Sequence, residues 1–158
     1  MMEPTPTLPR GRYFEEFQVG DRLRTRARTI TEGDIVTFAG VSGDFNSIHT
    51  DEVYATQTGF GRRVAHGLLG LSIVSGLAVR TGILEGTVLA FREINEWKFS
   101  LPVFIGDTVY ADLEIDEVKP FPRLGGGLVG LTFDVKNQSG QTAMKGRWTV
   151  LVASKPAS

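Results

Sequence analysis

An apolar run between Ala65 and Val79 is the most regular feature of the hydrophobic pattern. Every residue in it is apolar or small except His66, and Arg80 ends it. A helix that is apolar on every side is normally buried, and about fifteen residues are too few to span a bilayer, which takes roughly twenty. Its glycines each cost about 1 kcal/mol in a helix interior, which indicates that something approaches the backbone closely. The pattern predicts a buried core helix beginning near Gly67.

The chain beyond residue 86 has the alternation of antiparallel strands. In Thr108–Val118, the residues Val109, Ala111, Leu113 and Ile115 fall on one face and polar residues on the other. Turn-forming residues separate this segment from its neighbours. We expect strands at 87–100, 108–118, 128–136 and 142–152, a loop rich in Pro and Gly at 120–127, and a hairpin turn at 137–141.

The segment Arg22–Ile30 also alternates, and it places four arginines on one face of a predicted strand. Such a face can bind phosphates. It can equally be a solvated outer face or a protected edge strand, and we favour this second interpretation.

Helix-start signals precede and follow the segment that carries candidate chemistry. Thr31-Glu32-Gly33-Asp34 resembles a capping box, so a helix is expected to begin there and to stop within 40–43. Asp51 is expected to cap a second, short helix rather than to act as a catalytic acid. Between them, Phe45–Ile48 is a poor helix former, and we expect a loop.

Composition sets broad limits. The chain has 158 residues, a net charge of −1 and no cysteine. We expect one domain over 13–153 after a flexible tail at 1–12, with no nucleic-acid or membrane partner. Cys-based metal sites and thiolate chemistry are excluded, and no other metal is expected. The first ten residues have no apolar segment of the signal-peptide type, so we expect a cytoplasmic protein.

The two histidines, His49 and His66, are the only side chains whose ordinary pKa suits proton transfer near neutral pH. Asp44 precedes His49 by five residues, which on a straight helix would set the two about 140° apart. A loop could turn both toward one pocket. The spacing alone leaves a second interpretation open, in which Asp44 and Asn46 form an Asx turn and His49 is a partly exposed loop residue.

The start of the predicted core helix offers a second chemical group. The first N–H groups of a helix have no partner within it and lie at the positive end of the helix dipole. The Gly67 N–H could therefore receive the oxygen of a polarised carbonyl, as an oxyanion hole does.

These residues together resemble a known family. Asp44-Phe45-Asn46-Ser47-Ile48-His49, then Ala65-His66-Gly67 and Ser75-Gly76, are similar to the hydratase-2 motif of the MaoC-like dehydratases, the R-specific enoyl-CoA hydratases. Residues 98–107 and 137–140 resemble the strand, turn and last hairpin of that family. The resemblance covers roughly residues 13 to 152. Ser47 departs from it, because many relatives have proline there.

The resemblance implies an α+β hot-dog fold, with an antiparallel sheet of about five strands wrapped around a long central helix. Such a small sheet leaves edges and a face to cover, so we expect a homodimer or a higher oligomer. The resemblance also implies reversible hydration of a trans-2-enoyl-CoA to an (R)-3-hydroxyacyl-CoA, with the CoA thioester as substrate and no further cofactor. Asp44 and His49 would be the acid–base pair and Gly67 the oxyanion donor. Ser75 would orient Asp44, Asn46 would order the loop, and His66 would be structural.

Two other functions remain open at this stage. A hot-dog acyl-CoA thioesterase would use the same cleft, although such enzymes usually carry a carboxylate on or near the central helix, and 65–79 has none. A non-catalytic acyl-CoA-binding protein is the other alternative. Tyr54, Trp97 and Phe99 are candidate pocket walls that core packing explains equally well.

Overall fold

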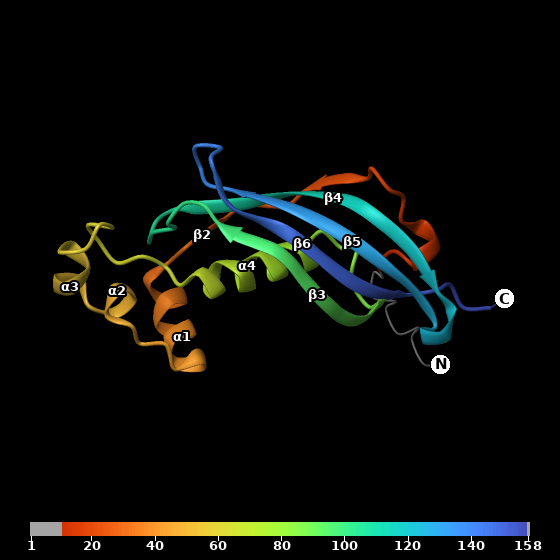
Figure 1. The fold of residues 1–158 in the computed structure, drawn as a ribbon, viewed down its shortest axis with the longest axis horizontal. Coiled ribbons are helices and arrows are strands. Elements are labelled where there is room, and N and C mark those ends of the chain that lie inside the picture. Colours follow the sequence, from red (N-terminus) through yellow and green to blue (C-terminus); the bar gives the residue numbers. More distant parts are fainter. Residues whose placement is uncertain (1–10, 158) are drawn as a thin grey trace, which may run out of the picture.

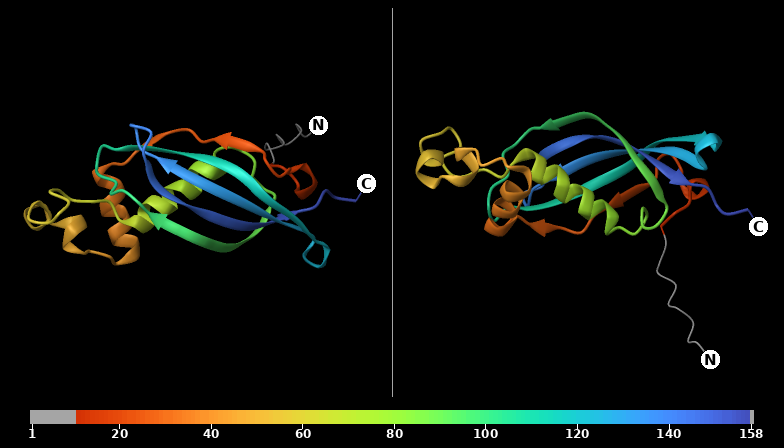
Figure 2. Two further views of the ribbon diagram at one scale, coloured as in Figure 1. Left: turned by 45° about the horizontal axis from the view of Figure 1, so that its top comes forward. Right: turned by 90° about the horizontal axis from the view of Figure 1, so that it is seen from below.

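The computed structural model describes residues 11–157, which form a curved antiparallel sheet over one long helix (Figure 1). The six strands are ordered β1-β4-β5-β6-β3, with β2 also beside β4. They are β1 Arg22–Arg24, β2 Arg28–Thr29, β3 Val88–Phe99, β4 Thr108–Phe121, β5 Gly126–Lys136 and β6 Thr142–Ala153. The central helix α4, Gly67–Val79, lies diagonally under this sheet (Figure 2). This is the hot-dog arrangement expected from the sequence.

Three shorter helices gather beyond one end of the sheet (Figure 1). They are α1 Glu32–Ser42, α2 Ser47–Thr50 and α3 Glu52–Thr56, and two 3₁₀ turns, η1 Phe14–Glu16 and η2 Pro122–Leu124, lie elsewhere. The expected cap of α1 is present: the Thr31 side chain accepts from the Asp34 N–H, and Asp34 bonds back to the Thr31 N–H. Asp51 caps α3 by accepting from the Tyr54 N–H at 2.9 Å. Both helix starts therefore follow the local sequence signals.

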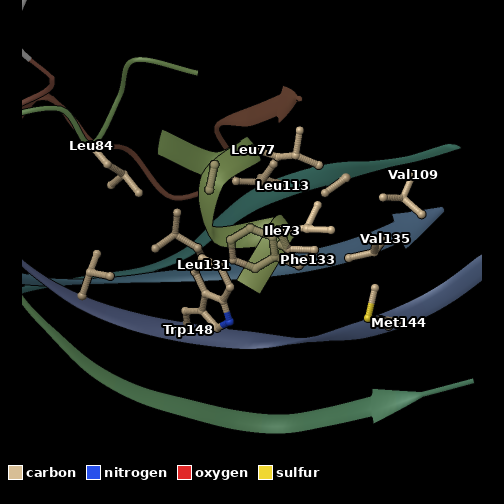
Figure 3. Close-up of a cluster of buried hydrophobic side chains, with 14 of the residues drawn as sticks. Ile73, Leu77, Leu84, Val109, Leu113, Leu131, Phe133, Val135, Met144 and Trp148 are labelled. Atoms are coloured by element: carbon tan, nitrogen blue, oxygen red, sulfur yellow. The ribbon is translucent and has the colours of Figure 1, made fainter. Parts of the chain in front are cut away.

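The core lies between α4 and the concave face of the sheet (Figure 3). From α4, Ile73 and Leu77 point toward Leu113 of β4 and Leu131 of β5. In β4, the alternate residues 109, 111, 113 and 115 are buried as the pattern predicted. Burying an aliphatic side chain of this size contributes about 1.5–3 kcal/mol, so this layer is the main source of stability.

The helix α4 is buried on one side only, which corrects the expectation of a helix enclosed all round. Six of its residues are buried, whereas Leu68 is 61% exposed and Val79 is 43% exposed. Figure 2 shows the reason: a single sheet covers one side of the helix, and none of the described elements covers the other. The open side of α4, which carries small and apolar residues, is therefore available for contact with another molecule.

Three strand predictions need correction. The sheet has six strands rather than about five. Half of the residues 120–127 are strand, because the turn needs only Pro122–Gly125, with Gly125 at φ +76°, and Pro120 pairs with Gly127. Arg22–Ile30 is broken into β1 and β2, both paired with β4.

Three of the four arginines of that segment meet acidic partners. Arg22 bonds to Glu114 at 3.0 Å and Arg24 to Asp112 at 2.6 Å, while Arg28 pairs with Asp34. Since β1 is an edge strand whose arginines are matched by acidic residues, the solvated edge interpretation fits better than a phosphate-binding patch.

The start of the described chain is bonded to the segment that follows α4. Most of the predicted tail lies outside the described residues. Its last two residues are held in place, since the Gly11 and Arg12 amides donate to the Glu85 and Ile83 carbonyls. Within the described range, no helix has the length and hydrophobicity needed to cross a membrane.

Candidate active site

The site lies where the α1–α3 end of the molecule meets the start of α4. Helix α1 ends at Gly43, whose φ of +77° is a conformation that residues with a side chain rarely adopt. This left-handed cap turns the chain sharply, and Asp44 follows immediately. The position of Asp44 thus depends on the C-terminal cap of α1.

Asp44 is an exposed loop residue held by short-range hydrogen bonds. Its N–H donates to Ser42 Oγ at 3.1 Å, and its carboxylate accepts from the Asn46 N–H at 3.2 Å. The second bond is the Asx turn of the alternative interpretation. Because this bond uses only Oδ1 of the carboxylate, the Asx turn leaves Oδ2 available for another contact.

His49 lies in a single helical turn, α2, where a loop was expected. The Asn46 side chain caps this turn by accepting from the Ile48 N–H at 3.2 Å. Because an Asn cap satisfies an N–H that would otherwise lack a partner, four residues of low helix propensity can form a turn here. The turn carries the His49 ring inward, where the residue is 7% exposed.

The His49 ring is fixed by the segment before α4. Its Nδ1 lies 2.6 Å from the Val64 carbonyl oxygen. A carbonyl only accepts, so Nδ1 must carry the proton and Nε2 has the free lone pair in the neutral ring. The Val64 N–H in turn donates to the Ile48 carbonyl. In His49, Nε2 is thus the ring nitrogen that remains able to accept a hydrogen bond.

His66 lies against both members of the expected pair. Its ring stacks on that of His49 with centroids 3.8 Å apart, and its Nε2 is 2.9 Å from the Asp44 carbonyl oxygen. One side-chain atom from each of Asp44, His49 and His66 lies within 4.8 Å of the others. The fold therefore brings the Asp44 and His49 side chains together beside a second imidazole.

This trio has a composition found in metal sites, but its geometry does not suit one. Imidazole nitrogens bind metals through lone pairs in the ring plane. The His49 and His66 planes differ by only 30° and lie face to face, so their lone pairs do not converge on a common point. Acid–base chemistry fits the arrangement better.

The Gly67 amide opens onto the same site. Gly67 is the first residue of α4, and its N–H donates no hydrogen bond to any residue that the structure describes. A Cβ at this position would lie 3.0 Å from the Phe99 ring, so glycine keeps the approach to the amide open. The Gly67 amide is therefore without a hydrogen-bond acceptor in the described part of the chain.

A cleft of about 510 Å³ runs past these groups. His49, His66 and Gly67 line one part of it, and its other walls are mostly apolar: Ile48, Phe60, Val64, Gly70, Phe99, Leu101 and Met144. A cavity of this size with few polar groups is typical of small-molecule sites. Of the three wall candidates from the sequence, only Phe99 is among the described residues that line the cleft. Trp97 packs on Trp148 instead, and Tyr54 is not a lining residue.

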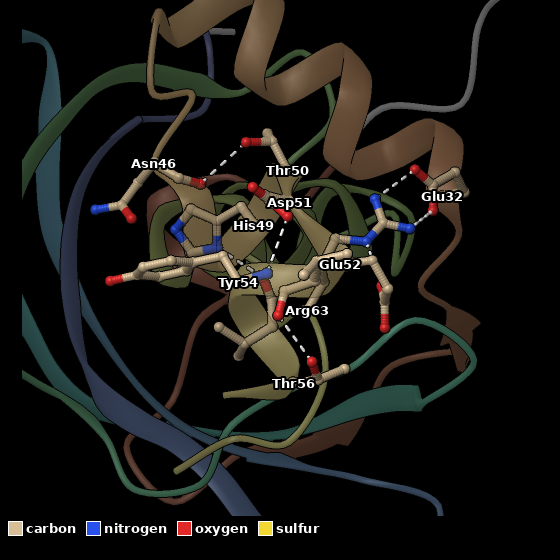
Figure 4. A network of polar contacts seen from close by, with 11 residues as sticks. Glu32, Asn46, His49, Thr50, Asp51, Glu52, Tyr54, Thr56 and Arg63 are labelled. Carbon is tan, nitrogen blue, oxygen red and sulfur yellow. Dashed lines mark hydrogen bonds and ion pairs between the residues drawn. The ribbon is translucent and has the colours of Figure 1, made fainter. Parts of the chain in front are cut away.

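Arg63 holds the short helices to one another (Figure 4). Its guanidinium donates to Glu32 of α1 and to Glu52 of α3, at 2.5–2.7 Å. The hydrogen bonds from Arg63 hold the pKa of Glu32 below its ordinary value, and those to Glu32 and Glu52 raise the pKa of Arg63. Arg63 is therefore a structural cation, while its neighbour Arg62 lies over the Phe104 ring at 4.0 Å.

The residues expected to support the acid–base pair differ in where the structure places them. The Asn46 side chain accepts from the Ile48 N–H and so caps the turn that carries His49. Ser75 is exposed, and in the described part of the chain it makes no hydrogen bond to Asp44. The cause is that eight helical residues, about 12 Å, separate it from Gly67. His66 was interpreted as a structural residue, but it contacts both Asp44 and His49. The sequence signal that could have drawn attention to it is that the chain has only two histidines.

Comparisons with known proteins agree with this architecture. The family model of the MaoC like domain matches residues 16–132. An (R)-specific enoyl-CoA hydratase of Rhodospirillum rubrum is 33% identical over 144 residues, 90% of this chain and 93% of that protein. Protein MaoC of Klebsiella aerogenes is 43% identical over 105 residues, 66% of this chain, and the match spans only 31% of that longer protein.

A solved structure from Archaeoglobus, described as a monoamine oxidase regulatory protein, superposes with a TM-score of 0.86 at 37% identity. The match covers 93% of this chain and 97% of that one. The family model, the relatives and the fold agree, and the chain belongs to the MaoC-like domain family.

Proposed function

We propose that this protein hydrates trans-2-enoyl-CoA thioesters reversibly to (R)-3-hydroxyacyl-CoA. The observation that carries the proposal is that the Asp44 and His49 side chains lie close together, while His49 and the free Gly67 amide line the same mostly apolar cleft. The name of the Rhodospirillum relative, an (R)-specific enoyl-CoA hydratase, supports the reaction and its stereochemistry.

Each group has a defined task in this reaction. Asp44 and His49 position a water molecule, and His49 Nε2 accepts a proton as the water oxygen bonds to the β-carbon. The acid–base pair then returns one proton to the α-carbon, so that one water is added across the double bond and both side chains regain their starting protonation. The thioester oxygen carries negative charge meanwhile and lies at the Gly67 N–H. General acid–base groups typically contribute about 10²- to 10⁴-fold.

The acid–base pair is tested with Asp44→Asn and His49→Asn. Asparagine at 49 can still donate to the Val64 carbonyl but has no base in the place of Nε2. We expect crotonyl-CoA hydration, followed as loss of enoyl-thioester absorbance, to fall about 10²- to 10⁴-fold in either variant, with the thermal midpoint unchanged. Near-normal turnover in either variant would refute the assignment.

The oxyanion donor is tested with Gly67→Pro against Gly67→Ala. Proline is accepted at the first position of a helix, and His66 already has φ −57° and ψ 135°, the conformation that precedes proline. Both variants add a Cβ near Phe99, but only proline removes the N–H. We expect kcat of the proline variant to be about 10²- to 10³-fold below that of the alanine variant. Equal rates would mean that this amide does not bind the oxygen.

The same assay separates hydration from thioester hydrolysis. A hydratase consumes the enoyl absorbance without releasing thiol, whereas a thioesterase releases CoA thiol that a disulfide reagent detects. The described part of α4 has no carboxylate to activate water at the carbonyl. We therefore expect loss of absorbance without thiol release, and an (R)-3-hydroxybutyryl product on chiral analysis.

We further propose that the protein acts as a homodimer in the cytoplasm. Of the described strands, β3 pairs with β6 alone, and it exposes Leu89, Phe91 and Ile94. The open side of α4 adds Leu68 and Val79. Exposed apolar surface of this kind is typical of an interface between copies. Analytical ultracentrifugation tests this, and a monomer at micromolar concentration would contradict it.

A further inference from the structure

Asp44 has few restraints for a residue placed in the reaction. It belongs to no helix or strand, and two of its three hydrogen bonds join it to Ser42 and Asn46, which are only two residues away. Bonds of such short range shape the loop but cannot fix its distance from α4. The third bond, from His66 Nε2 to the Asp44 carbonyl at 2.9 Å, comes from 22 residues away. Within the described chain, it is the hydrogen bond that ties this loop to the start of α4.

His66 also contacts the other two groups of the site. It stacks on His49 at 3.8 Å between ring centroids, with Phe38 4.9 Å away. It is the N-cap residue of α4, so the Gly67 amide follows it directly in the chain. One rigid ring thus sets the spacing between the carboxylate loop, the imidazole base and the oxyanion donor.

The ring nitrogens show that packing alone does not explain a histidine here. His66 is 2% exposed, and its Nδ1 is buried without a hydrogen-bond partner in the described part of the chain. A buried polar atom without a partner is unfavourable, and a phenylalanine of similar shape would avoid that penalty. A histidine at this position therefore stabilises something through its other nitrogen, Nε2, which donates to the Asp44 carbonyl.

We propose that His66 is a positioning residue for the reaction: its Nε2–H holds the Asp44 backbone so that the Asp44 carboxylate faces His49. This inference depends on the proposed hydration. It assigns His66 no proton transfer, because Nε2 is occupied by the carbonyl and Nδ1 is buried. The residue acts through Asp44, and its removal changes turnover rather than binding.

Two variants separate the hydrogen bond from the packing. His66→Phe keeps a ring for the stack but has no donor. His66→Gln loses the ring, while its side-chain amide can reach the place of Nε2 and donate to the carbonyl. A misplacement of about 1 Å costs roughly 10²-fold in rate. We expect kcat for crotonyl-CoA to fall about 100-fold in the Phe variant and less than about 10-fold in the Gln variant.

A purely structural role is distinguished by two further measurements. The Kd for butyryl-CoA, a saturated analogue, should change less than about threefold in both variants. In an Asp44→Asn background, His66→Phe should lower kcat by less than about threefold, because two residues that act through one group are not additive. Phe38→Leu is the packing control: it should lower the thermal midpoint and leave kcat near that of the wild type.

The outcomes decide between the two proposals. Equal kcat losses in the Phe and Gln variants, or an undiminished effect in the Asp44→Asn background, would overturn the role of His66 while leaving hydration intact. Wild-type kcat in the Phe variant would do the same. If the wild-type protein binds crotonyl-CoA without hydrating it, the proposed function fails, and the positioning role fails with it.

Discussion

The sheet and the site end of the molecule are built in different ways. The strands β4, β5 and β6 pair over most of their length, and their inward side chains are almost fully buried. The α1–α3 end consists of helices of 11, 4 and 5 residues. It is held by side-chain caps, by Arg63 and by the bonds of His49 and His66. Stability therefore resides mainly in the sheet layer, and the proposed active site lies in the end that has fewer buried side chains.

This division has a physical reason. A reacting carboxylate must face a cleft with unfilled hydrogen-bonding capacity, and a well-packed core cannot supply that. The site instead uses polar bonds to orient groups, each contributing only about 0.5–1.5 kcal/mol. Substitutions in the two regions should thus separate into losses of stability and losses of turnover.

The largest expected effect on stability is in the sheet layer. Leu131 of β5 is fully buried in the core cluster between α4 and the sheet, and Leu131→Ala should lower the free energy of unfolding by about 2–5 kcal/mol. Urea unfolding measures this. At a temperature where the variant is still folded, kcat should stay near wild type. Val53→Ala, at a site 71% exposed, is the control and should change neither the free energy of unfolding nor kcat. A large loss of kcat in folded Leu131→Ala would contradict the separation of stability from turnover.

A smaller effect is expected at Arg63. Its side chain is 18% exposed and bonds to two carboxylates on different helices. Arg63→Gln should lower the free energy of unfolding by about 1 kcal/mol, since both partners are themselves largely exposed. The kcat should also fall, although a loss of about 1 kcal/mol leaves nearly all of the protein folded. The reason is that α1 and α3 flank Asp44 and His49, so loosening these helices moves the two side chains. If stability fell as much as in Leu131→Ala, the site end would be as strongly stabilised as the sheet.

Acid should weaken the fold through paired carboxylates. The pKa of Glu32 is lowered by Arg63, and that of Asp112 by Arg24 and then Lys136. A carboxyl whose pKa is lowered on folding stabilises the protein above its unfolded pKa, and this is lost as pH falls through the folded pKa. Stability should therefore fall as pH drops below the ordinary values of 4.5 and 3.8. Urea titrations from pH 7 to 3 test this, and Arg63→Gln should show a shallower decline; an identical decline would contradict the assignment to Glu32.

The smallest effect is expected on the outer face of the sheet. Arg24 bonds to Asp112, but its side chain is 63% exposed, and pairs of this kind contribute little. Arg24→Gln should leave the thermal midpoint at pH 7 and kcat within experimental scatter. A marked loss of acyl-CoA affinity would instead revive the phosphate-binding interpretation of this face.

Much of the architecture could be predicted from local sequence signals. Alternation in Thr108–Val118 determined which face of β4 is buried, and the Thr31 and Asp51 caps determined where α1 and α3 begin. The apolar run ending at Arg80 gave α4 and placed Gly67 at its start. These features depend on residues close together in the chain, whose periodicity and capping chemistry are visible without a fold.

The tertiary structure alone decided the relations between distant segments. The stack of His66 on His49 joins residues 17 positions apart, and the bond of His66 to the Asp44 carbonyl joins residues 22 apart. The open side of α4 follows from the number of layers, which no periodicity encodes. The sequence determined which chemical groups are present and where the helices and strands begin. Their convergence depended on how the 43–50 and 64–67 segments pack, because non-local contacts form only when the whole chain has buried its core.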